Sequence, residues 1–329
     1  MVAALCLLLA GCGAKSGNIR VRITDVGPGL QPQYLANTLA QSLGFYKKEG
    51  LDVTIETVPS AAKSMQALIG GSVDVGCITY MQTIQLAAEG QHVRTFFIGM
   101  QRAFNVLVVS PRASRKIARI EDLKGATIGI PSPGSPSHLW LNYYLAARGV
   151  RPAEVNTVAI GVAASAVAAV ESGRIDAAVL AGGDHLRLLR REPSLRILVD
   201  GSLPEVMRDT FGGNLYASGA LAAKQEWLER NPEIARRLAR AAGAALQWIR
   251  SHTPEEIRDH LPESARSQDA EGDLEIIRWS LGGFTPDGKM PVGAPEAMKR
   301  YLDATVDNVR SAKINLAETW TNEFLPQVK

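Results

Sequence analysis

The sequence predicts an α/β protein made of two lobes, each a mostly parallel sheet flanked by helices. Two observations lead to this prediction. Strand-like and helix-like patterns alternate through most of the chain before residue 224, the order that builds parallel sheets with right-handed crossovers. In addition, residues 58–77 align with residues 160–179 without a gap. A duplicated strand–helix unit therefore indicates two lobes of similar design.

The repeated segments are VPSAAKSMQALIGGSVDVGC and IGVAASAVAAVESGRIDAAV. Their identical positions pair residues Ala61, Ala62, Ala67, Gly71 and Asp74 with Ala163, Ala164, Ala169, Gly173 and Asp176. Each half is expected to run strand, Pro-Gly loop, helix, strand, short loop, helix, Gly-x-Val/Ile-Asp and strand. Two copies of so long a unit do not make a solenoid. The Gly-x-Val-Asp sequence also suits a turn between a helix and a strand in any α/β protein, but the gapless match favours duplication.

The loop PSPGSPSH, residues 131–138, is the first candidate for binding. Ser135 is a preferred N-cap residue and Pro136 suits the first helical position, so a helix is expected from here to Gly149. Free backbone N–H groups and the helix dipole attract anions to such an end. We expect Gly134, Ser135 and Ser137 to hold a ligand oxyanion, with simple capping as the alternative. His138 could donate to the same anion or be a packing residue.

Composition and charge restrict the possible functions. The chain has 329 residues, 46% of them hydrophobic, which is enough for two lobes of ordinary size. Its formal net charge is only +3, and Lys and Arg are scattered along the sequence. We therefore expect no nucleic-acid partner.

The N-terminal segment MVAALCLLLAGCG indicates export. Its apolar run is too short to span a bilayer and ends in small residues, although no Lys or Arg precedes it. Leu9-Ala10-Gly11-Cys12 resembles a bacterial lipobox, so residues 1–18 are expected to be signal and tether, cleaved before a lipidated Cys12. The protein would then be anchored at the cell envelope, on the periplasmic side in a Gram-negative cell.

Cysteine and histidine usage supports no cofactor. With Cys6 removed and Cys12 lipidated, Cys77 is left as a small hydrophobic residue, and no intramolecular disulfide is possible. No cluster has metal-ligand spacing. We expect neither a metal nor another cofactor.

Six phrases, in order, resemble the solute-binding proteins of ABC importers in the sulfonate, nitrate and taurine class, which includes relatives of thiamine-precursor-binding proteins. They are GFYKKEGLDVTIE, ALIGGSVDVGCITYMQTIQLAAEG, IEDLKGATIGIPSPGS, AAVESGRIDAAVL, WLERNPEIARRLARA and ETWTNEFL. The resemblance runs from about Ile19 to Leu325. It implies a type II periplasmic-binding fold, in which two lobes close on a small ligand and deliver it to a membrane permease with its ATP-binding subunits.

On this basis, residues 19–105 and 216–329 are expected to form the first lobe with C-terminal helices, and residues 106–215 the second. The chain would cross between lobes near 104–110 and 212–219, segments that could absorb a hinge motion. Helices after Lys224 are expected to pack outside the cleft. We expect the protein to be a monomer.

Ligands of open α/β sheets bind beyond the carboxyl ends of the strands. In the first lobe we expect hydroxyl, ring and backbone contacts from loop residues, namely Ser60, Ala61, Thr79, Tyr34 and Tyr80. Capping or packing would explain each of them equally well. In the second lobe, Asp184 could favour a ligand with an amine or hydroxyl, or be a solvated N-cap. Arg102 could neutralise a ligand charge near the hinge or lie at the surface.

The sequence favours a non-enzymatic receptor for a small organic anion, a sulfonate, a carboxylate or a similar molecule. GIPSPG places its serine one position too late for a G-x-S-x-G elbow, and neither G-x-x-x-x-G-K-[ST] nor H-E-x-x-H occurs. Three alternatives remain open: a sensory lipoprotein with the same cleft, a receptor for a neutral pyrimidine or other heterocycle, and a biosynthetic enzyme of the same fold. The export segment disfavours the enzyme.

Overall fold

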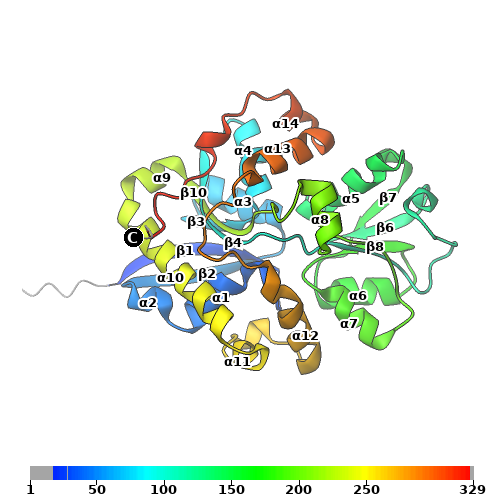
Figure 1. Ribbon diagram of the computed structural model, residues 1–329, viewed down its shortest axis with the longest axis horizontal. Coiled ribbons are helices and arrows are strands. Elements are labelled where there is room, and N and C mark those ends of the chain that lie inside the picture. Colours follow the sequence, from blue (N-terminus) through cyan, green and yellow to red (C-terminus); the bar gives the residue numbers. More distant parts are fainter. Residues whose placement is uncertain (1–17, 28, 327–329) are drawn as a thin grey trace, which may run out of the picture.

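The computed structural model describes residues 18–27 and 29–326. The expected lipidation site, Cys12, lies outside the described residues. Within them, two five-stranded sheets lie side by side, each with helices on its faces (Figure 1). This arrangement confirms the predicted two-lobed α/β fold.

The first sheet has the strand order β2-β1-β3-β10-β4. Its strands are β1 (Ile19–Val26), β2 (Leu51–Val58), β3 (Val75–Ile78), β4 (Val93–Met100) and β10 (Ser218–Lys224). The helices between these strands are α1 (Leu35–Ser42), α2 (Phe45–Lys48), α3 (Ala61–Gly70) and α4 (Tyr80–Ala88), with the 3-10 turn η1 (Pro32–Tyr34) before α1. β1 pairs in parallel with β2 and β3, whereas β10 runs antiparallel to β3 and β4.

The second sheet repeats this plan in the order β7-β6-β8-β5-β9. Its strands are β5 (Val106–Val109), β6 (Thr127–Ile130), β7 (Asn156–Ala159), β8 (Ala177–Leu180) and β9 (Arg196–Asp200). Its helices are α5 (Pro136–Ala147), α6 (Ala164–Glu171), α7 (Asp184–Arg191) and α8 (Pro204–Phe211), with η2 (Ile120–Leu123) and η3 (Pro152–Glu154). Here β5 is the antiparallel strand, between β8 and β9.

The duplicated Gly-x-Val/Ile-Asp motif has one structural role in both lobes. The carboxylate of Asp74 accepts a hydrogen bond from the backbone N–H of Arg22 in β1, at 2.8 Å. The carboxylate of Asp176 accepts one from the backbone N–H of Thr127 in β6, at 2.9 Å. Each aspartate precedes the strand that pairs with the one it bonds. The motif therefore fixes how the third parallel strand of each lobe sits beside the first.

Two connections join the sheets. One runs from β4 to β5 through residues 101–105, and the other runs from α8 to β10 through residues 212–217. The expected crossings near 104–110 and 212–219 overlap these connections and run on into the strands, since residues 106–109 lie in β5 and residues 218–219 in β10. The strands that follow these connections, β5 and β10, are the ones that run antiparallel to their neighbours.

The C-terminal third is mainly helical. Its helices are α9 (Gln225–Arg230), α10 (Pro232–Ser251), α11 (Pro254–Asp259), α12 (Ala270–Ser280), α13 (Ala294–Thr305) and α14 (Asp307–Ser311), with η4 (Glu263–Ala265), η5 (Leu281–Gly283) and η6 (Leu316–Glu318). α10 packs on α1, α2 and β4 of the first lobe. α12 contacts α7, and α13 contacts α4, α5 and α8. The C-terminal helices therefore touch both lobes, which the sequence patterns did not indicate.

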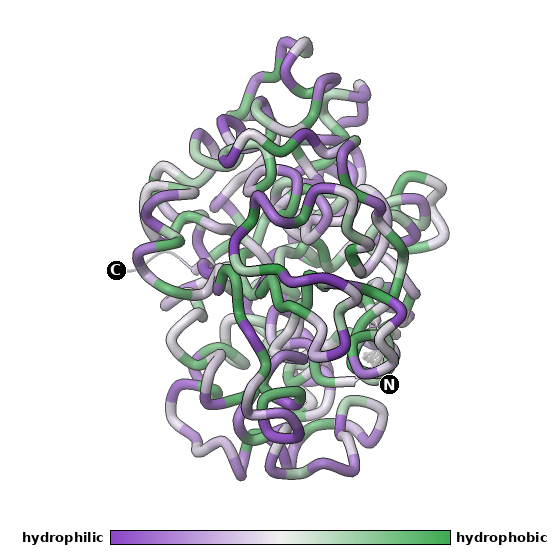
Figure 2. Tube along the Cα trace, turned by 90° about the vertical axis from the view of Figure 1, so that its right-hand side faces the viewer, coloured by the Kyte–Doolittle hydropathy of each residue, from purple (hydrophilic) through white to green (hydrophobic). Residues whose placement is uncertain are grey.

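Apolar residues form the interior of both lobes. Figure 2 shows hydrophobic segments concentrated in the middle of the molecule, while the outer turns are largely hydrophilic. One buried cluster joins Tyr80 and Met81 of α4, Met207 and Phe211 of α8, and Tyr301 of α13, so it spans the two lobes. In residues 18–27 and 29–326, every helix is too short or too polar to cross a bilayer.

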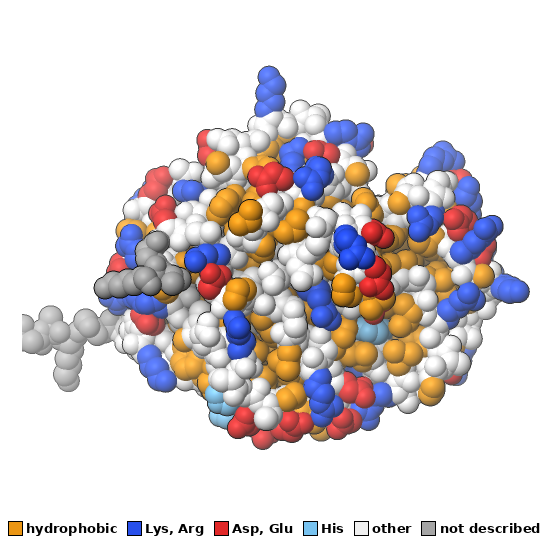
Figure 3. Space-filling model, in the orientation of Figure 1, with side chains coloured by type: hydrophobic (Ala, Val, Ile, Leu, Met, Phe, Trp, Pro, Cys, Tyr) orange, Lys and Arg blue, Asp and Glu red, His pale blue; other side chains and the backbone are white. Residues whose placement is uncertain are grey.

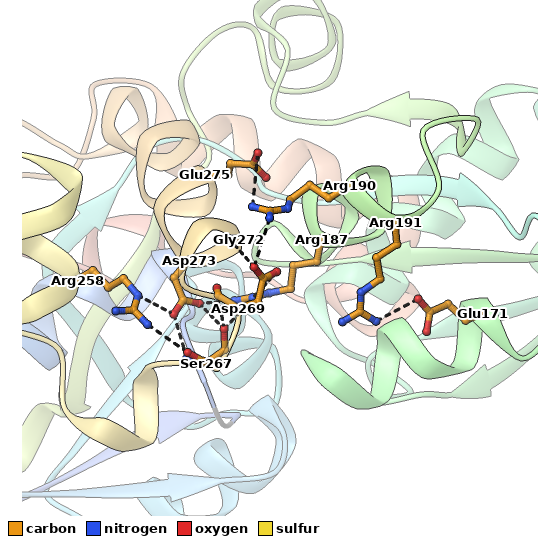
Figure 4. Close-up of polar contacts among 10 residues, drawn as sticks. All are labelled: Glu171, Arg187, Arg190, Arg191, Arg258, Ser267, Asp269, Gly272, Asp273 and Glu275. Carbon is orange, nitrogen blue, oxygen red and sulfur yellow. Dashed lines mark hydrogen bonds and ion pairs between the residues drawn. The ribbon is translucent and has the colours of Figure 1, made fainter.

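An ion-pair network also links the second lobe to the C-terminal helices (Figure 4). The Asp273 side chain is fully buried on α12 and lies 2.5 Å from the Arg187 guanidinium of α7 and 3.2 Å from that of Arg258. The backbone N–H and the hydroxyl of Ser267 each donate to Asp273 at 2.9 Å. The carboxylate is thus fully paired, as a buried charge must be.

Replacing Asp273 with alanine should lower the thermal unfolding midpoint by roughly 5 to 10 °C. The replacement leaves Arg187 and Arg258, both largely buried, without their shared carboxylate, which should lower the free energy of unfolding by about 3–5 kcal/mol. Differential scanning calorimetry measures the change. Glu271→Ala, on the same helix, removes an exposed carboxylate paired with Arg278 and should shift the midpoint by no more than about 1 °C. Equal shifts in the two variants would contradict this account.

Candidate functional site

A cleft lies where the carboxyl ends of strands from both sheets meet. About 730 Å³ of it is unfilled by atoms, part of this space being open to solvent. The carboxyl ends of all six parallel strands contribute to it, from Val26 at the end of β1 to Gly182 after β8. The lining residues are Val26, Gln31, Gln33, Tyr34, Pro59, Ser60, Ala61, Thr79, Gln82, Phe104, Asn105, Pro131, Ser132, Ser135, Pro136, Ser137, Val162, Ala181, Gly182, Tyr216 and Ser218.

Six of the ten residues proposed from the sequence line this cleft. They are Tyr34, Ser60, Ala61, Thr79, Ser135 and Ser137. The structure brings together residues more than one hundred positions apart because equivalent loops of the two lobes face each other. The other four, Gly134, His138, Tyr80 and Asp184, are not among the lining residues, and each has a different structural reason.

The two serines at the start of α5 line the cleft, and Ser135 also caps the helix. Ser135 Oγ accepts a hydrogen bond from the backbone N–H of His138 at 3.3 Å, so the residue caps the helix while its own O–H proton stays available. Ser137 Oγ donates to Asn105 Oδ1 at 2.7 Å. Both hydroxyls are therefore oriented by protein partners at the positive end of the α5 dipole.

His138 and Gly134 stabilise the loop before α5 instead of lining the cleft. His138 Nδ1 accepts a hydrogen bond from the backbone N–H of Gly134 at 3.0 Å, and Gly134 adopts a φ of 71°. Burial lowers the pKa of the half-buried imidazole, which favours the neutral form that can accept this bond. The ring closes the turn, and the expected donation to a ligand finds no support here.

Tyr80 is a core residue. Its side chain is fully buried between α4 and the C-terminal helices, and its hydroxyl lies 2.5 Å from Thr319 Oγ1. Burial raises the pKa of this phenol well above its usual value. The expected role as a cleft wall is wrong because the first turn of α4 directs the ring away, toward α13.

Asp184 acts behind the cleft wall. Its buried carboxylate accepts a hydrogen bond from the backbone N–H of Ala163 at 2.8 Å. Ala163 has a φ of 56°, which a residue with a side chain adopts only when its surroundings impose it. Burial raises the pKa of Asp184 to about 6, while the bond from Ala163 and the charge of Arg187 oppose the rise. Asp184 thus holds the turn that carries Val162 into the cleft.

Arg102 is engaged within the hinge region. Its guanidinium donates to the backbone carbonyl of Trp279 at 2.9 Å and lies 5.2 Å from the centre of the Phe104 ring. Phe104 itself lines the cleft, whereas Arg102 is not among the lining residues. The arginine therefore supports an aromatic wall and is not placed to neutralise a ligand charge.

Sequence reasoning missed the amides of the cleft. Four glutamine and asparagine side chains line it: Gln31, Gln33, Gln82 and Asn105. Among the residues that the structure describes, Gln31 Nε2, Gln33 Oε1 and Gln82 Nε2 have no hydrogen-bond partner although they are buried, and the same holds for Ser218 Oγ. A signal existed for Gln82 alone, since Thr79-x-x-Gln82 has the spacing of a capping box.

The cleft carries polar side chains but no charged ones. None of its described lining residues is an aspartate, glutamate, lysine, arginine or histidine. Positive potential comes instead from the N-termini of α3, α4 and α5, which begin beside Ser60, Thr79 and Ser135. Lys, Arg, Asp and Glu are interspersed on the outer face drawn in Figure 3, so that face offers no continuous basic surface.

Metal binding was not expected from the sequence. Across the described ranges, no group of three or more His, Cys, Asp or Glu side chains is placed to hold a metal ion. Cys77 is buried as a free thiol in β3, and burial raises its pKa well above the usual value.

The pH dependence of stability should reveal the buried Asp184 carboxyl. Its pKa is higher in the folded state than in the unfolded chain, so its contribution is fully present below about pH 4 and is lost as the pH rises through about 6. From pH 5 to pH 8, the wild type should lose about 1.4 kcal/mol relative to Asp184→Asn. Calorimetric midpoints of the two proteins at both pH values measure this difference.

Asp209→Asn, which removes an exposed carboxyl from the same lobe, serves as the matched control. Its stability relative to the wild type should change little over the same range. If the difference in stability between the wild type and Asp184→Asn stays constant from pH 5 to pH 8, the pKa of the Asp184 carboxyl is not raised by folding.

The chain resembles known proteins in sequence and in structure. The riboflavin-binding protein RibY of Chloroflexus aurantiacus is 26% identical, over 89% of this chain and 83% of RibY. A protein of known structure from Bordetella bronchiseptica RB50 is 33% identical, with a TM-score of 0.86 over 93% of this chain and 95% of that one. The alkanesulfonate-binding protein SsuA from Xanthomonas axonopodis pv. citri, bound to MOPS, is 16% identical, with a TM-score of 0.69 over 92% and 98%.

The SsuA similarity is one of fold, and it confirms the type II periplasmic-binding architecture predicted from the six phrases. At the sequence level, the family model described as "NMT1/THI5 like" matches residues 31–257, well over half of the chain. The protein therefore belongs to the NMT1/THI5-like family.

Proposed function

We propose that this protein is the substrate-binding component of an ABC importer and traps a small organic anion between its lobes. The observation that carries the proposal is the cleft itself, where strand-end loops of two lobes surround one space and three helix N-termini open onto it. The names of relatives such as RibY and SsuA, both binding proteins, support the same class.

The chemistry of the lining favours a ligand with a single negative charge. No carboxylate among the described lining residues would repel an anion, and helix N-termini with neutral hydroxyls and amides would stabilise it. A dianion would lack the cationic side chains needed to balance its second charge. Three aromatic rings, those of Tyr34, Phe104 and Tyr216, would contact an apolar or planar body.

A neutral heterocycle is the second candidate ligand. The unpartnered Gln33 Oε1 could accept a hydrogen bond from a ring N–H, and the cleft lacks the charged side chains that would otherwise mark it for an ion. An enzymatic role is disfavoured because none of the described lining residues is a histidine, cysteine, lysine or carboxylate that could act as acid, base or activated nucleophile.

A thermal-shift screen of the purified protein tests the ligand class. Alkyl and aryl sulfonates, carboxylates, nitrate, pyrimidines and riboflavin would be compared at equal concentration. Monovalent organic anions should raise the unfolding midpoint, because a ligand that binds the folded state stabilises it by mass action. A rise with neutral heterocycles and with no anion would overturn the anion proposal.

The double variant Ser135→Ala plus Ser137→Ala should weaken binding of the best anion from that screen by about ten- to a hundredfold. A hydroxyl that donates to a charged ligand contributes on the order of 1–2 kcal/mol, which Ser135 can do directly, while Ser137 holds Asn105 in the cleft wall. Isothermal titration calorimetry measures the affinity. Thr253→Ala, which removes the N-cap of α11 far from the cleft, should lower stability and leave affinity unchanged. Unchanged affinity in the double variant would remove α5 from the site.

We further propose that the protein is exported and held at the cell envelope by a lipid on Cys12. The support is the sequence Leu9-Ala10-Gly11-Cys12 after a short apolar run. Cys12→Ser should move the protein from the membrane fraction to the soluble fraction of the expressing cell, as followed by immunoblotting, whereas Cys6→Ser should not. Membrane retention of the Cys12 variant would contradict lipid anchoring.

A binding protein for import and one for sensing would have the same cleft and would differ in the membrane protein to which they bind. Neighbouring genes for a permease and an ATP-binding subunit would support import, while a neighbouring histidine kinase gene would support sensing. Impaired uptake of the bound ligand by a deletion strain would favour the importer directly.

A further inference from the structure

Gln82 has a side chain whose orientation is fixed by the protein. Its Oε1 atom accepts hydrogen bonds from the backbone N–H and from the hydroxyl of Thr79, both at 3.0 Å. A backbone N–H can only donate, so the atom facing it must be the amide oxygen. Nε2 is therefore the free end of the amide. It is buried, has no partner, and belongs to a residue that lines the cleft.

Ser218 supplies a second free polar atom beside it. The start of α4 is joined to the start of β10 by a hydrogen bond from the Tyr80 backbone N–H to the Ala217 carbonyl, at 3.1 Å. Ser218 follows directly and is only 1% exposed, yet its Oγ has no hydrogen-bond partner. Ser137, by contrast, already donates to Asn105. Ser218 thus carries a buried hydroxyl with no hydrogen-bond partner in residues 18–27 and 29–326.

The amide orientations of the neighbouring Gln31 and Gln33 are not fixed in this way. Gln33 Nε2 donates to Gln31 Oε1 at 3.2 Å, but turning both amides over together would preserve that bond with the roles exchanged. Their free atoms could therefore be either a donor or an acceptor. Only Gln82 presents a group whose polarity is settled, an N–H₂ that donates.

We propose that Gln82 and Ser218 form a subsite of the first lobe that recognises a second hydrogen-bond acceptor on the ligand. This inference rests on the proposed function and deepens it. The start of α5 receives the anionic group on the second lobe, so the substrate class is an organic anion that also carries a carbonyl, amide or similar oxygen toward the first lobe. Two buried donors left without a partner select strongly for a ligand that satisfies them.

An anion with a purely apolar tail is a poor substrate by this account, because it would bury both donors unsatisfied. The matched pair 5-oxohexanoate and hexanoate tests this directly, since the two acids differ only in a ketone oxygen far from the carboxylate. In isothermal titration calorimetry, the full-length wild type should bind 5-oxohexanoate at least tenfold more tightly than hexanoate.

Ser218→Ala is the sharpest variant, because its hydroxyl has no protein partner to lose. The unfolding midpoint should stay the same or rise, while the preference for 5-oxohexanoate falls by about tenfold. Gln82→Glu keeps an oxygen for the Thr79 N–H and replaces the donor with a second acceptor, so the preference should disappear, while its added charge should weaken the binding of both acids alike. Gln82→Met supplies the same test without a buried charge, should the glutamate variant fail to fold.

Two controls separate binding from stability. Ser280→Ala removes a buried hydroxyl that donates to the Ile277 carbonyl, so it should lower the midpoint and leave the preference intact. Gln66→Glu adds the same charge as Gln82→Glu at the edge of the first lobe, outside the cleft lining, and should also leave it intact.

The outcomes distinguish the subsite from the proposed function. Equal binding of the two acids by the wild type, or an unchanged preference in both Ser218→Ala and Gln82→Met, overturns the subsite and leaves the anion receptor in place. Binding of neither acid, together with no response to any other anion, overturns the proposed anion receptor and the subsite that rests on it.

Discussion

Parallel pairing of three strands in each lobe is the constraint on which the rest of the structure depends. Because β1, β2 and β3 run the same way, their carboxyl ends share one edge of the sheet, and β6, β7 and β8 repeat this arrangement. Asp74 and Asp176 secure the third strand of each set by bonding a backbone N–H of the first. With the two edges facing each other, short loops and helix N-termini are the groups that meet in the space between the lobes.

That origin explains why the cleft has neutral polar groups. Helix caps such as Ser60, Thr79 and Ser135 are where hydroxyl residues are favoured, so the same side chains that begin α3, α4 and α5 also line the cleft. Unpartnered amide and hydroxyl groups lower the stability of the empty protein. A ligand that supplies the missing partners recovers this free energy, which couples binding to selectivity.

The C-terminal helices add contacts that bear on motion between the lobes. Asp273 of α12 is paired with Arg187 of α7, and Tyr301 of α13 packs against Phe211 of α8. Any rotation of the second lobe about residues 101–105 and 212–217 must carry these contacts along or break them. The free energy of any such rotation would therefore depend on packing outside the cleft.

The sequence by itself indicated two lobes through the gapless duplication. It also determined the strand-end loops and the helix starts, because Pro-Gly turns and serine caps depend on only a few neighbouring residues. It thereby predicted Ser135, Ser137, Ser60 and Thr79 as residues at the strand ends, and all four line the cleft. Tertiary structure alone decided which neighbours of those loops enter the cleft. The Tyr80 ring lies in the core, where its hydroxyl bonds Thr319. The Asp184 carboxylate lies behind the cleft wall, where it accepts a hydrogen bond from the Ala163 N–H. Gln82, Asn105 and Ser218 came from a helix turn, a connection and a returning strand, whose meeting depends on contacts far apart in the chain.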